Sequence, residues 1–442
     1  MNNFMIFIEQ TLHGYQNGHQ LLSKSFEITE SAQQLMLRLS DLSGQNIQNN
    51  FNRYYTGYLL EETNKAVLSC TWYADEMNRP GCVWTHSLLI DINDFEAISN
   101  NFEEIISLFH RPKDSCDFDY ATTINFAPSL RNISSNLSTE RLKYIVWSIW
   151  GNAKSVIIPN DNSKDYIYEL TYLWFKYKKY LPRDFSFCTC SLGNRRINNK
   201  LFSLQIIPNN FIGAVCNHLK SECKILPSQR EIKSFPMWVK QSSHILTDLY
   251  EEFDEFLCKL DSNKYSYEHF NFFIKLYLAL NVEENHVDLV NGLIIIDKSM
   301  NEDYKSYYAN KLISLYMNQV NIKFDATEVL LYLIETPLLK IHEKCLTEII
   351  GLTYKQNKQQ IGNIIKVLLK KDSYGKTEFI LDNYAHIVSM DDLVLITNLD
   401  VSLCCVFVAF RFEYALCKEF WKQSEYFQKE ILATLKDVNG NC

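Results

Sequence analysis

The sequence predicts an α+β N-terminal domain, with mixed or antiparallel sheets and helices, followed by an all-α domain built as a helical repeat or a bundle. Turn signals separate short strand-like runs in the first half, whereas apolar residues at three- and four-residue spacing fill the second half. Eight of the nine prolines lie before residue 238, and proline depletion is typical of helical sequence. We therefore predict domains at residues 1–238 and 239–442.

Composition narrows the classes of protein that the chain can belong to. Its 442 residues suffice for two or three domains, and the hydrophobic content of 47% supplies folded cores. The 44 basic and 52 acidic residues give a net charge of −8, and no run of basic residues is longer than a pair. This charge pattern does not support nucleic-acid binding, but it does not exclude it. No apolar stretch approaches the roughly 20 residues that span a bilayer, so we predict no membrane partner.

The N-terminus and the cysteines indicate the compartment. The first residues lack the basic start and long apolar stretch of a secretory signal. Thirteen cysteines cannot all pair within one chain, and cysteines without a signal are typical of free thiols in a reducing cytosol. We therefore predict a cytoplasmic protein.

A β-hairpin is predicted at the start of the chain. Asn17-Gly18 favours a two-residue type I′ turn, because both positions then need a positive φ. With that turn, side-chain alternation places His13 and Tyr15 on one face of the sheet and His19 on the other, so the two histidines would not bind one metal. A bulge at Gly14 would reverse this assignment.

The remaining elements follow from periodicity and turn signals. A helix is predicted from an N-cap at Thr29 to Leu39. Strands are predicted at residues 54–60, 66–74, 82–92, 156–159, 185–191 and 201–208, the last two as a pair across the basic turn 193–196. Further helices are predicted at residues 94–109, 140–150, 164–180, 244–260, 269–280, 303–317, 327–334, 348–355, 361–369, 403–410 and 417–435. Arg195-Arg196 could meet an acidic partner, but the interpretation that we prefer is a solvated turn.

Aromatic and charged residues concentrate around a charged hairpin tip at residues 71–86. If the two strands pair, their tryptophans, Tyr73 and His86 come together, and such an aromatic surface could hold a ligand or a peptide. The competing interpretation is that both tryptophans are core residues. Together with the first hairpin, the predicted binding surface contains His13, Tyr15, Gln20, Trp72, Tyr73, Asp75, Glu76, Arg79, Trp84 and His86.

The same region contains the ingredients of a catalytic site. His13 or His86 with the thiol of Cys82 or a nearby acid could supply a general base or a Cys–His dyad, which makes a hydrolase the alternative function. Structural roles for the histidines compete with that hypothesis. No Cys-x-x-Cys, His-Glu-x-x-His, Gly-x-Ser-x-Gly or Gly-x-Gly-x-x-Gly motif occurs, so we predict no metal, no cofactor and no catalytic residue.

Several stretches together resemble a known family. They are residues 10–22, 39–44, 55–58, 71–77 and 79–86, with a weaker match at 187–192. They resemble the type 1 N-terminal domain of the GTPase-associated proteins of bacterial conflict systems. The resemblance implies a non-enzymatic scaffold, sensor or adaptor in antiphage or related immunity, whose partners would be a GTPase and effector or adaptor proteins encoded nearby. A phage-derived trigger is one alternative, and the sequence does not name the trigger. A third hypothesis is direct recognition of a phage nucleic acid or protein by the aromatic strands.

Overall fold

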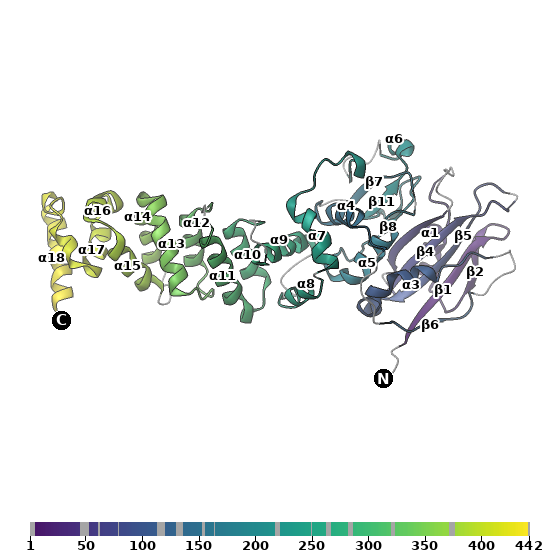
Figure 1. Cartoon of the computed structure of the whole chain (residues 1–442), viewed down its shortest axis with the longest axis horizontal. Helices are drawn as coiled ribbons and strands as arrows, with labels where there is room; N and C mark the ends of the chain where they lie inside the picture. Colours follow the sequence, from purple (N-terminus) through teal and green to yellow (C-terminus); the bar gives the residue numbers. More distant parts are fainter. Residues whose placement is uncertain are drawn as a thin grey trace. The chain divides into compact units, whose positions relative to one another are not determined.

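The computed structural model describes residues 5–44, 53–60, 62–77, 79–112, 120–129, 136–152, 155–162, 164–216, 222–248, 250–261, 267–281, 286–319, 323–370 and 376–440. The chain forms two compact units: unit 1 contains residues 1–253 and 266–271, and unit 2 contains residues 254–265 and 272–442. Unit 1 combines sheet and helices, and unit 2 is helical, which confirms the predicted fold class (Figure 1). The domain boundary after residue 238 stays a prediction.

Unit 1 is built around a mixed sheet (Figure 1). Its strands are β1 (Ile6–Tyr15), β2 (His19–Lys24), β3 (Arg53–Leu60), β4 (Lys65–Tyr73), β5 (Val83–Asp91), β6 (Ile124–Phe126), β7 (Ser155–Pro159), β8 (Phe187–Cys188), β11 (Leu204–Ile207) and β12 (Cys223–Ile225). They lie in the order β12-β7-β11-β8-β3-β4-β5-β1-β2, and β6 also pairs with β1. The strands β1 to β5 are antiparallel, whereas β7, β8, β11 and β12 pair in parallel.

Two layers of helices cover the antiparallel part of the sheet. The helices of unit 1 are α1 (Glu30–Ser40), α2 (Phe95–Ile98), α3 (Phe102–Ser107), α4 (Thr139–Trp150), α5 (Ile167–Lys176), α6 (Ile212–Cys216) and α7 (Met237–Thr247). Thr29 caps α1 as predicted, and Met36 and Leu39 of α1 pack in one cluster with Tyr54 and Tyr58 of β3. On the opposite face, Trp174 of α5 lies edge-on against Phe187, whose ring covers Gly57.

One predicted strand pairing is wrong. The segments 185–191 and 201–208 do contain neighbouring strands, but β8 and β11 are parallel. A short turn cannot connect parallel neighbours, because the chain must return to the same end of the sheet. The hairpin in this region is instead a separate two-stranded sheet of β9 (Arg196–Ile197) and β10 (Lys200–Leu201), and its turn residues Asn198 and Asn199 have φ values of 47° and 66°.

Two helices, α8 (Tyr250–Leu257) and α9 (Phe270–Asn281), contain the residues at which the units divide. The later helices are α10 (Leu289–Ser299), α11 (Glu302–Met317), α12 (Ala326–Glu335), α13 (Glu343–Gln356), α14 (Ile361–Lys370), α15 (Lys376–Ile387), α16 (Met390–Thr397), α17 (Val401–Phe410) and α18 (Glu425–Gly440). From α10 to α17, even-numbered helices contact even-numbered ones and odd-numbered helices contact odd-numbered ones, so they form two rows (Figure 1). The description as a helical repeat stays a prediction.

The helix predictions hold for most of this region and fail at its end. The predicted segment 417–435 is wrong over its first part, because Gln423 is extended and α18 begins at Glu425. The segment 244–260 is two helices, α7 and α8, and the helices α10, α15 and α16 were not predicted. Among the helices that the structure describes, none combines the length and apolar character needed to cross a membrane.

Candidate functional site

The predicted binding residues lie at one end of the antiparallel part of the sheet, where the β1–β2 turn and the β4–β5 turn meet. The strands β4 and β5 pair as expected, with Trp72 opposite Trp84. β1 lies on the other side of β5, with His13 opposite Thr85. The sheet therefore brings both predicted hairpins side by side.

The register of the first hairpin differs from the prediction. Tyr15 pairs with His19, so the loop has three residues, and a further irregularity lies between Leu12 and His13. Asn17 has the expected positive φ, but the extra loop residue shifts the pairing by one, and a shift of one reverses the faces. The prediction that the two histidines face apart is therefore wrong: their rings stack with centroids 6.3 Å apart.

His13 is buried beneath the C-terminal end of α1. Its exposed fraction is 0%, and neither ring nitrogen has a hydrogen-bond partner. Burial, followed by the charge of neighbouring His19, lowers the pKa of His13 to about 3. His19 is anchored beside it by a contact of 2.8 Å between its Nε2 and Oγ of Ser40. A substrate cannot reach His13 in this structure. His13 therefore does not supply the general base that the hydrolase hypothesis requires.

His86 lies on the opposite face and is also fully buried. The backbone N–H of His110 donates to its Nδ1 at 3.3 Å, so the neutral ring carries its proton on Nε2 and donates to Oε1 of Gln10 at 2.9 Å. The rings of Tyr120 and Phe109 pack edge-on against it. Burial, with the charge of His110, lowers the pKa of His86 to about 3. These contacts give His86 a structural role in a buried aromatic cluster.

The described residues do not place the Cys82 thiol or a group of metal ligands in a catalytic or metal-binding arrangement. The thiol of Cys82 is buried, and burial raises its pKa, so it is protonated at neutral pH. Three cavities on the described part of unit 1 are lined by residues other than Cys82, His13 and His86. In the described ranges of the chain, no three His, Cys, Asp or Glu side chains are grouped as metal ligands.

A network of polar contacts holds the β4–β5 turn. The indole N–H of Trp84 donates to Oε1 of Glu76 at 2.7 Å, and the guanidinium of Arg111 forms an ion pair with the same carboxylate. Arg111 also donates to the backbone oxygen of Tyr73 at 3.2 Å and lies 3.6 Å from Oδ1 of Asp75. Partial burial opposes ionisation of Glu76, but the contacts with Trp84 and Arg111 outweigh it and lower its pKa. No sequence pattern pointed to Arg111, because it lies outside the hairpin.

The predicted set divides into core and surface residues. His13, Trp84 and His86 are buried, so the core interpretation applies to Trp84. The other seven reach the surface, and we call them the turn surface: Tyr15, Gln20, Trp72, Tyr73, Asp75, Glu76 and Arg79. Within it, the guanidinium of Arg79 lies over the ring of Tyr15 at 5.6 Å from the centroid.

The two arginines of the basic turn have different environments. Arg195 is 6% exposed, and its guanidinium donates to the backbone oxygens of Leu39 and Asp41 at 3.0 and 2.7 Å. The interpretation of Arg195 as solvated is therefore wrong, because the last carbonyls of α1 require donors. Arg196 is half-buried and pairs with Glu222 at 2.9 Å.

Comparison with curated proteins and with solved structures found no match. A family model does match residues 7–109, a segment that contains β1 to β5 and α1 to α3. That model describes GTPase-associated protein 1, N-terminal domain type 1. The match confirms the resemblance seen in the sequence: residues 7–109 of this chain are similar to the type 1 N-terminal domain of GTPase-associated protein 1.

Proposed function

We propose that this protein is a non-enzymatic scaffold, sensor or adaptor of a bacterial GTPase-linked conflict system, and that the turn surface binds the GTPase. The observation that carries the proposal is the family match of residues 7–109, a family described as GTPase-associated. Antiphage immunity, a phage-derived trigger and a cytoplasmic location complete the proposed setting. The free thiols of the described cysteines support that location.

The chemistry of the turn surface supports a protein partner. Exposed Arg79 lies over the ring of half-exposed Tyr15, and Trp72 and Tyr73 at the end of β4 are also half-exposed. Aromatic and arginine side chains contribute most to protein interfaces. The contacts of Glu76 with Trp84 and Arg111 hold the turn in one conformation before binding. Preorganisation of this kind lowers the entropy cost of association.

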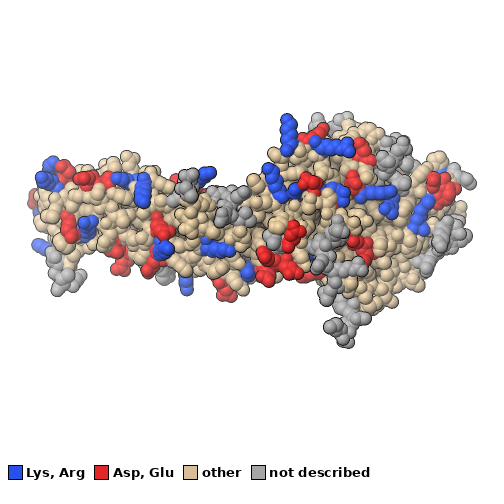
Figure 2. Space-filling model, viewed as in Figure 1, with Lys and Arg blue, Asp and Glu red and all other residues tan. Residues whose placement is uncertain are grey.

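The distribution of charge supports a protein partner over a nucleic acid. On the face drawn in Figure 2, lysine and arginine side chains are interspersed with aspartate and glutamate on each unit. A nucleic-acid site requires basic residues gathered along the path of the phosphates. A mixed surface instead matches another protein's mixed surface.

The helices of unit 2 support a second part of the proposal. Two rows of short helices present an extended surface that suits binding of other proteins. We assign effector or adaptor binding to this unit. GTPase binding at the turn surface and effector binding at unit 2 would make the chain a link between the two.

The test uses the full chain and the purified GTPase encoded beside it. Binding is measured by biolayer interferometry with the GTPase loaded with GDP or with a non-hydrolysable GTP analogue. Arg79→Glu and Tyr73→Ala should each weaken binding about tenfold, as expected for hot-spot residues. Exposed Arg230 lies outside the turn surface, so Arg230→Glu is the matched control and should bind as the wild type does.

Three results would contradict the proposal. Absence of binding in both nucleotide states would remove the GTPase as partner. Equal binding by the wild type and both turn-surface variants would place the interface elsewhere. Turnover of a nucleotide or a peptide by the purified chain alone would overturn the non-enzymatic assignment.

A further inference from the structure

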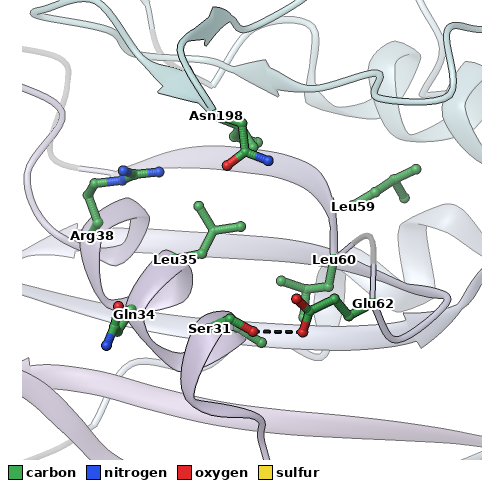
Figure 3. Close-up of a pocket in the computed structure, with 10 residues that line it drawn as sticks. Ser31, Gln34, Leu35, Arg38, Leu59, Leu60, Glu62 and Asn198 are labelled. Atoms are coloured by element: carbon green, nitrogen blue, oxygen red, sulfur yellow. Dashed lines mark hydrogen bonds between the residues drawn. The ribbon is translucent and has the colours of Figure 1, made fainter.

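A groove of about 280 Å³ runs along α1, and we call it the α1 groove. Its apolar floor contains Leu35 of α1, Leu59 and Leu60 at the end of β3, and Ile197 of β9. Leu35, Leu59 and Ile197 are only half-buried. Figure 3 shows Leu35 extending from α1 toward Asn198 of the β9–β10 turn, whereas the side chain of Leu59 extends away from α1. The floor can therefore bury further apolar side chains.

The two ends of the α1 groove carry opposite charges. At one end, Oε2 of Glu62 accepts a hydrogen bond from Oγ of Ser31 at 2.7 Å (Figure 3). At the other end, exposed Arg38 has no hydrogen-bond or ion-pair partner among the residues that the structure describes. Arg38 lies seven positions after Ser31 in the helix, so the two ends are about 10 Å apart along the axis of α1.

The rim of the groove provides groups that recognise a peptide backbone. Asn198, in the β9–β10 turn, faces Leu35 and Arg38 across the groove in Figure 3. Gln34 of α1 lines the same space. A side-chain amide both donates and accepts hydrogen bonds, as a peptide group does. These two amides therefore suit an extended chain lying in the groove.

We propose that the α1 groove binds a short extended segment of a partner protein, with a basic side chain at Glu62, an apolar side chain over Leu35 and Leu59, and an acidic side chain at Arg38. Side chains of an extended chain alternate between its two faces and advance about 3.3 Å per residue, so the three side chains that enter the groove are two residues apart, and the two charged ones are four residues, about 13 Å, apart. The site goes beyond the proposed GTPase contact, because the turn surface and the α1 groove have no residue in common.

The shape of the groove favours an extended chain over a compact metabolite. A second cavity of about 50 Å³ adjoins the first and shares Leu59, Ile197 and Asn198 with it. This second cavity reaches Lys200, whose Nζ lies 3.0 Å from Oδ2 of Asp184. A bound chain therefore has room to continue past Asn198, next to the β9–β10 hairpin.

Fluorescence polarisation with capped peptides tests the proposal on the full chain. The reference probe carries Lys-Ser-Leu-Ser-Glu between glycine–serine flanks, which places the Lys, Leu and Glu side chains on one face, and comparison probes carry Lys-Ser-Leu-Ser-Lys, Glu-Ser-Leu-Ser-Glu or Lys-Ser-Ser-Ser-Glu. Wild-type protein should bind the reference probe most tightly. Arg38→Glu should weaken that binding about tenfold, since an attractive pair becomes a repulsive one.

The single variants should also change the preferred probe. Arg38→Glu makes both ends acidic and should favour Lys-Ser-Leu-Ser-Lys, whereas Glu62→Lys makes both ends basic and should favour Glu-Ser-Leu-Ser-Glu. Arg230→Glu, at an exposed arginine outside the groove, is the control for a general charge effect. Circular dichroism checks that each variant is folded.

Several outcomes would overturn the inference. Equal binding of all four probes by the wild type would show that neither the charged ends nor the apolar floor of the groove selects the ligand. Variants that keep the wild-type preference would place binding elsewhere. Arg38-dependent binding of inorganic phosphate without binding of any peptide would make the groove an anion site. None of these results depends on the GTPase, so the two proposals fail separately.

Discussion

The indole N–H of Trp84 donates to Oε1 of Glu76 at 2.7 Å, which joins a buried strand residue to the exposed β4–β5 turn. Trp84 is 1% exposed, whereas the side chain of Glu76 is 48% exposed. The contact therefore fixes Glu76 against the buried core. Glu76 lies in the turn that we assign to partner binding. Arg111 holds the same carboxylate from a segment outside the hairpin.

Removal of the Glu76 carboxylate should destabilise unit 1. In Glu76→Ala, the buried indole N–H of Trp84 loses its acceptor, which costs about 1–3 kcal/mol. Asp75→Ala is the matched control, because the Asp75 side chain is 78% exposed and lies 3.6 Å from Arg111. The measurement is urea unfolding followed by tryptophan fluorescence. Equal midpoints for the two variants would show that the Trp84 contact adds no stability.

The stability of unit 1 should fall as the pH falls below about 6.5, the pKa of histidine in an unfolded chain. Burial lowers the folded-state pKa of both His13 and His86 to about 3. Between these values the unfolded chain binds more protons than the folded chain does, so each histidine removes up to about 1.4 kcal/mol of stability per pH unit. Above pH 6.5 neither group contributes.

Urea midpoints between pH 7.5 and 5 measure this dependence. His86→Gln should reduce the slope of stability against pH, because one titrating group is lost. His244→Gln is the control, since that side chain is 59% exposed. If His86→Gln and the wild type lose stability in parallel, His86 is already protonated in the folded protein and the assigned tautomer is wrong.

Gly14 should tolerate no side chain. A Cβ atom at Gly14 would lie 2.3 Å from Cε3 and Cζ3 of Trp84, which is buried and hydrogen-bonded to Glu76. Gly14→Ala should therefore cost about 1–3 kcal/mol through overpacking. Gly213→Ala, with no atom within 4 Å of the added Cβ, should leave the thermal midpoint unchanged or raise it. A neutral Gly14→Ala would show that the Trp84 ring can move.

The features that sequence predicted are those encoded locally. Thr29 caps α1, and the charged tip after Tyr73 separates two strands that pair with each other. The first hairpin was predicted with the wrong register, because Asn17-Gly18 is compatible with both a two-residue and a three-residue loop. The turn residues therefore predict where the hairpin lies, but they do not predict on which face of the sheet His13 and His19 lie.

The features that sequence did not predict depend on contacts between distant segments. Parallel pairing of β8 with β11 and the contact of Arg111 with Glu76 join parts of the chain that no local pattern links. The α1 groove likewise brings together Arg38 and Asn198, which are far apart in the sequence of unit 1. Adjacent arginines at 195 and 196 have the same chemistry, and only the position of the α1 C-terminus decides which one is buried.

Among the residues that join distant segments, Arg195 should contribute most to the free energy of unfolding of unit 1. It is 6% exposed and donates to the backbone oxygens of Leu39 and Asp41. Arg195→Ala leaves these oxygens without their charged donor, which should cost about 3 kcal/mol. Arg195→Lys should recover only part of this loss, since an ammonium lacks the planar fork of a guanidinium. Arg196→Ala should cost less than Arg195→Ala, because the Arg196–Glu222 ion pair is partly exposed to solvent.

Hydrogen exchange distinguishes a capping role for Arg195 from general destabilisation. The amides in the last turn of α1 should exchange faster in Arg195→Ala under conditions in which β4 keeps its protection. Arg38 lies in that turn, so the same variant should also weaken peptide binding in the α1 groove. Uniform loss of protection across α1 and β4 would contradict the capping role, because it would show that Arg195 stabilises unit 1 as a whole rather than the end of one helix.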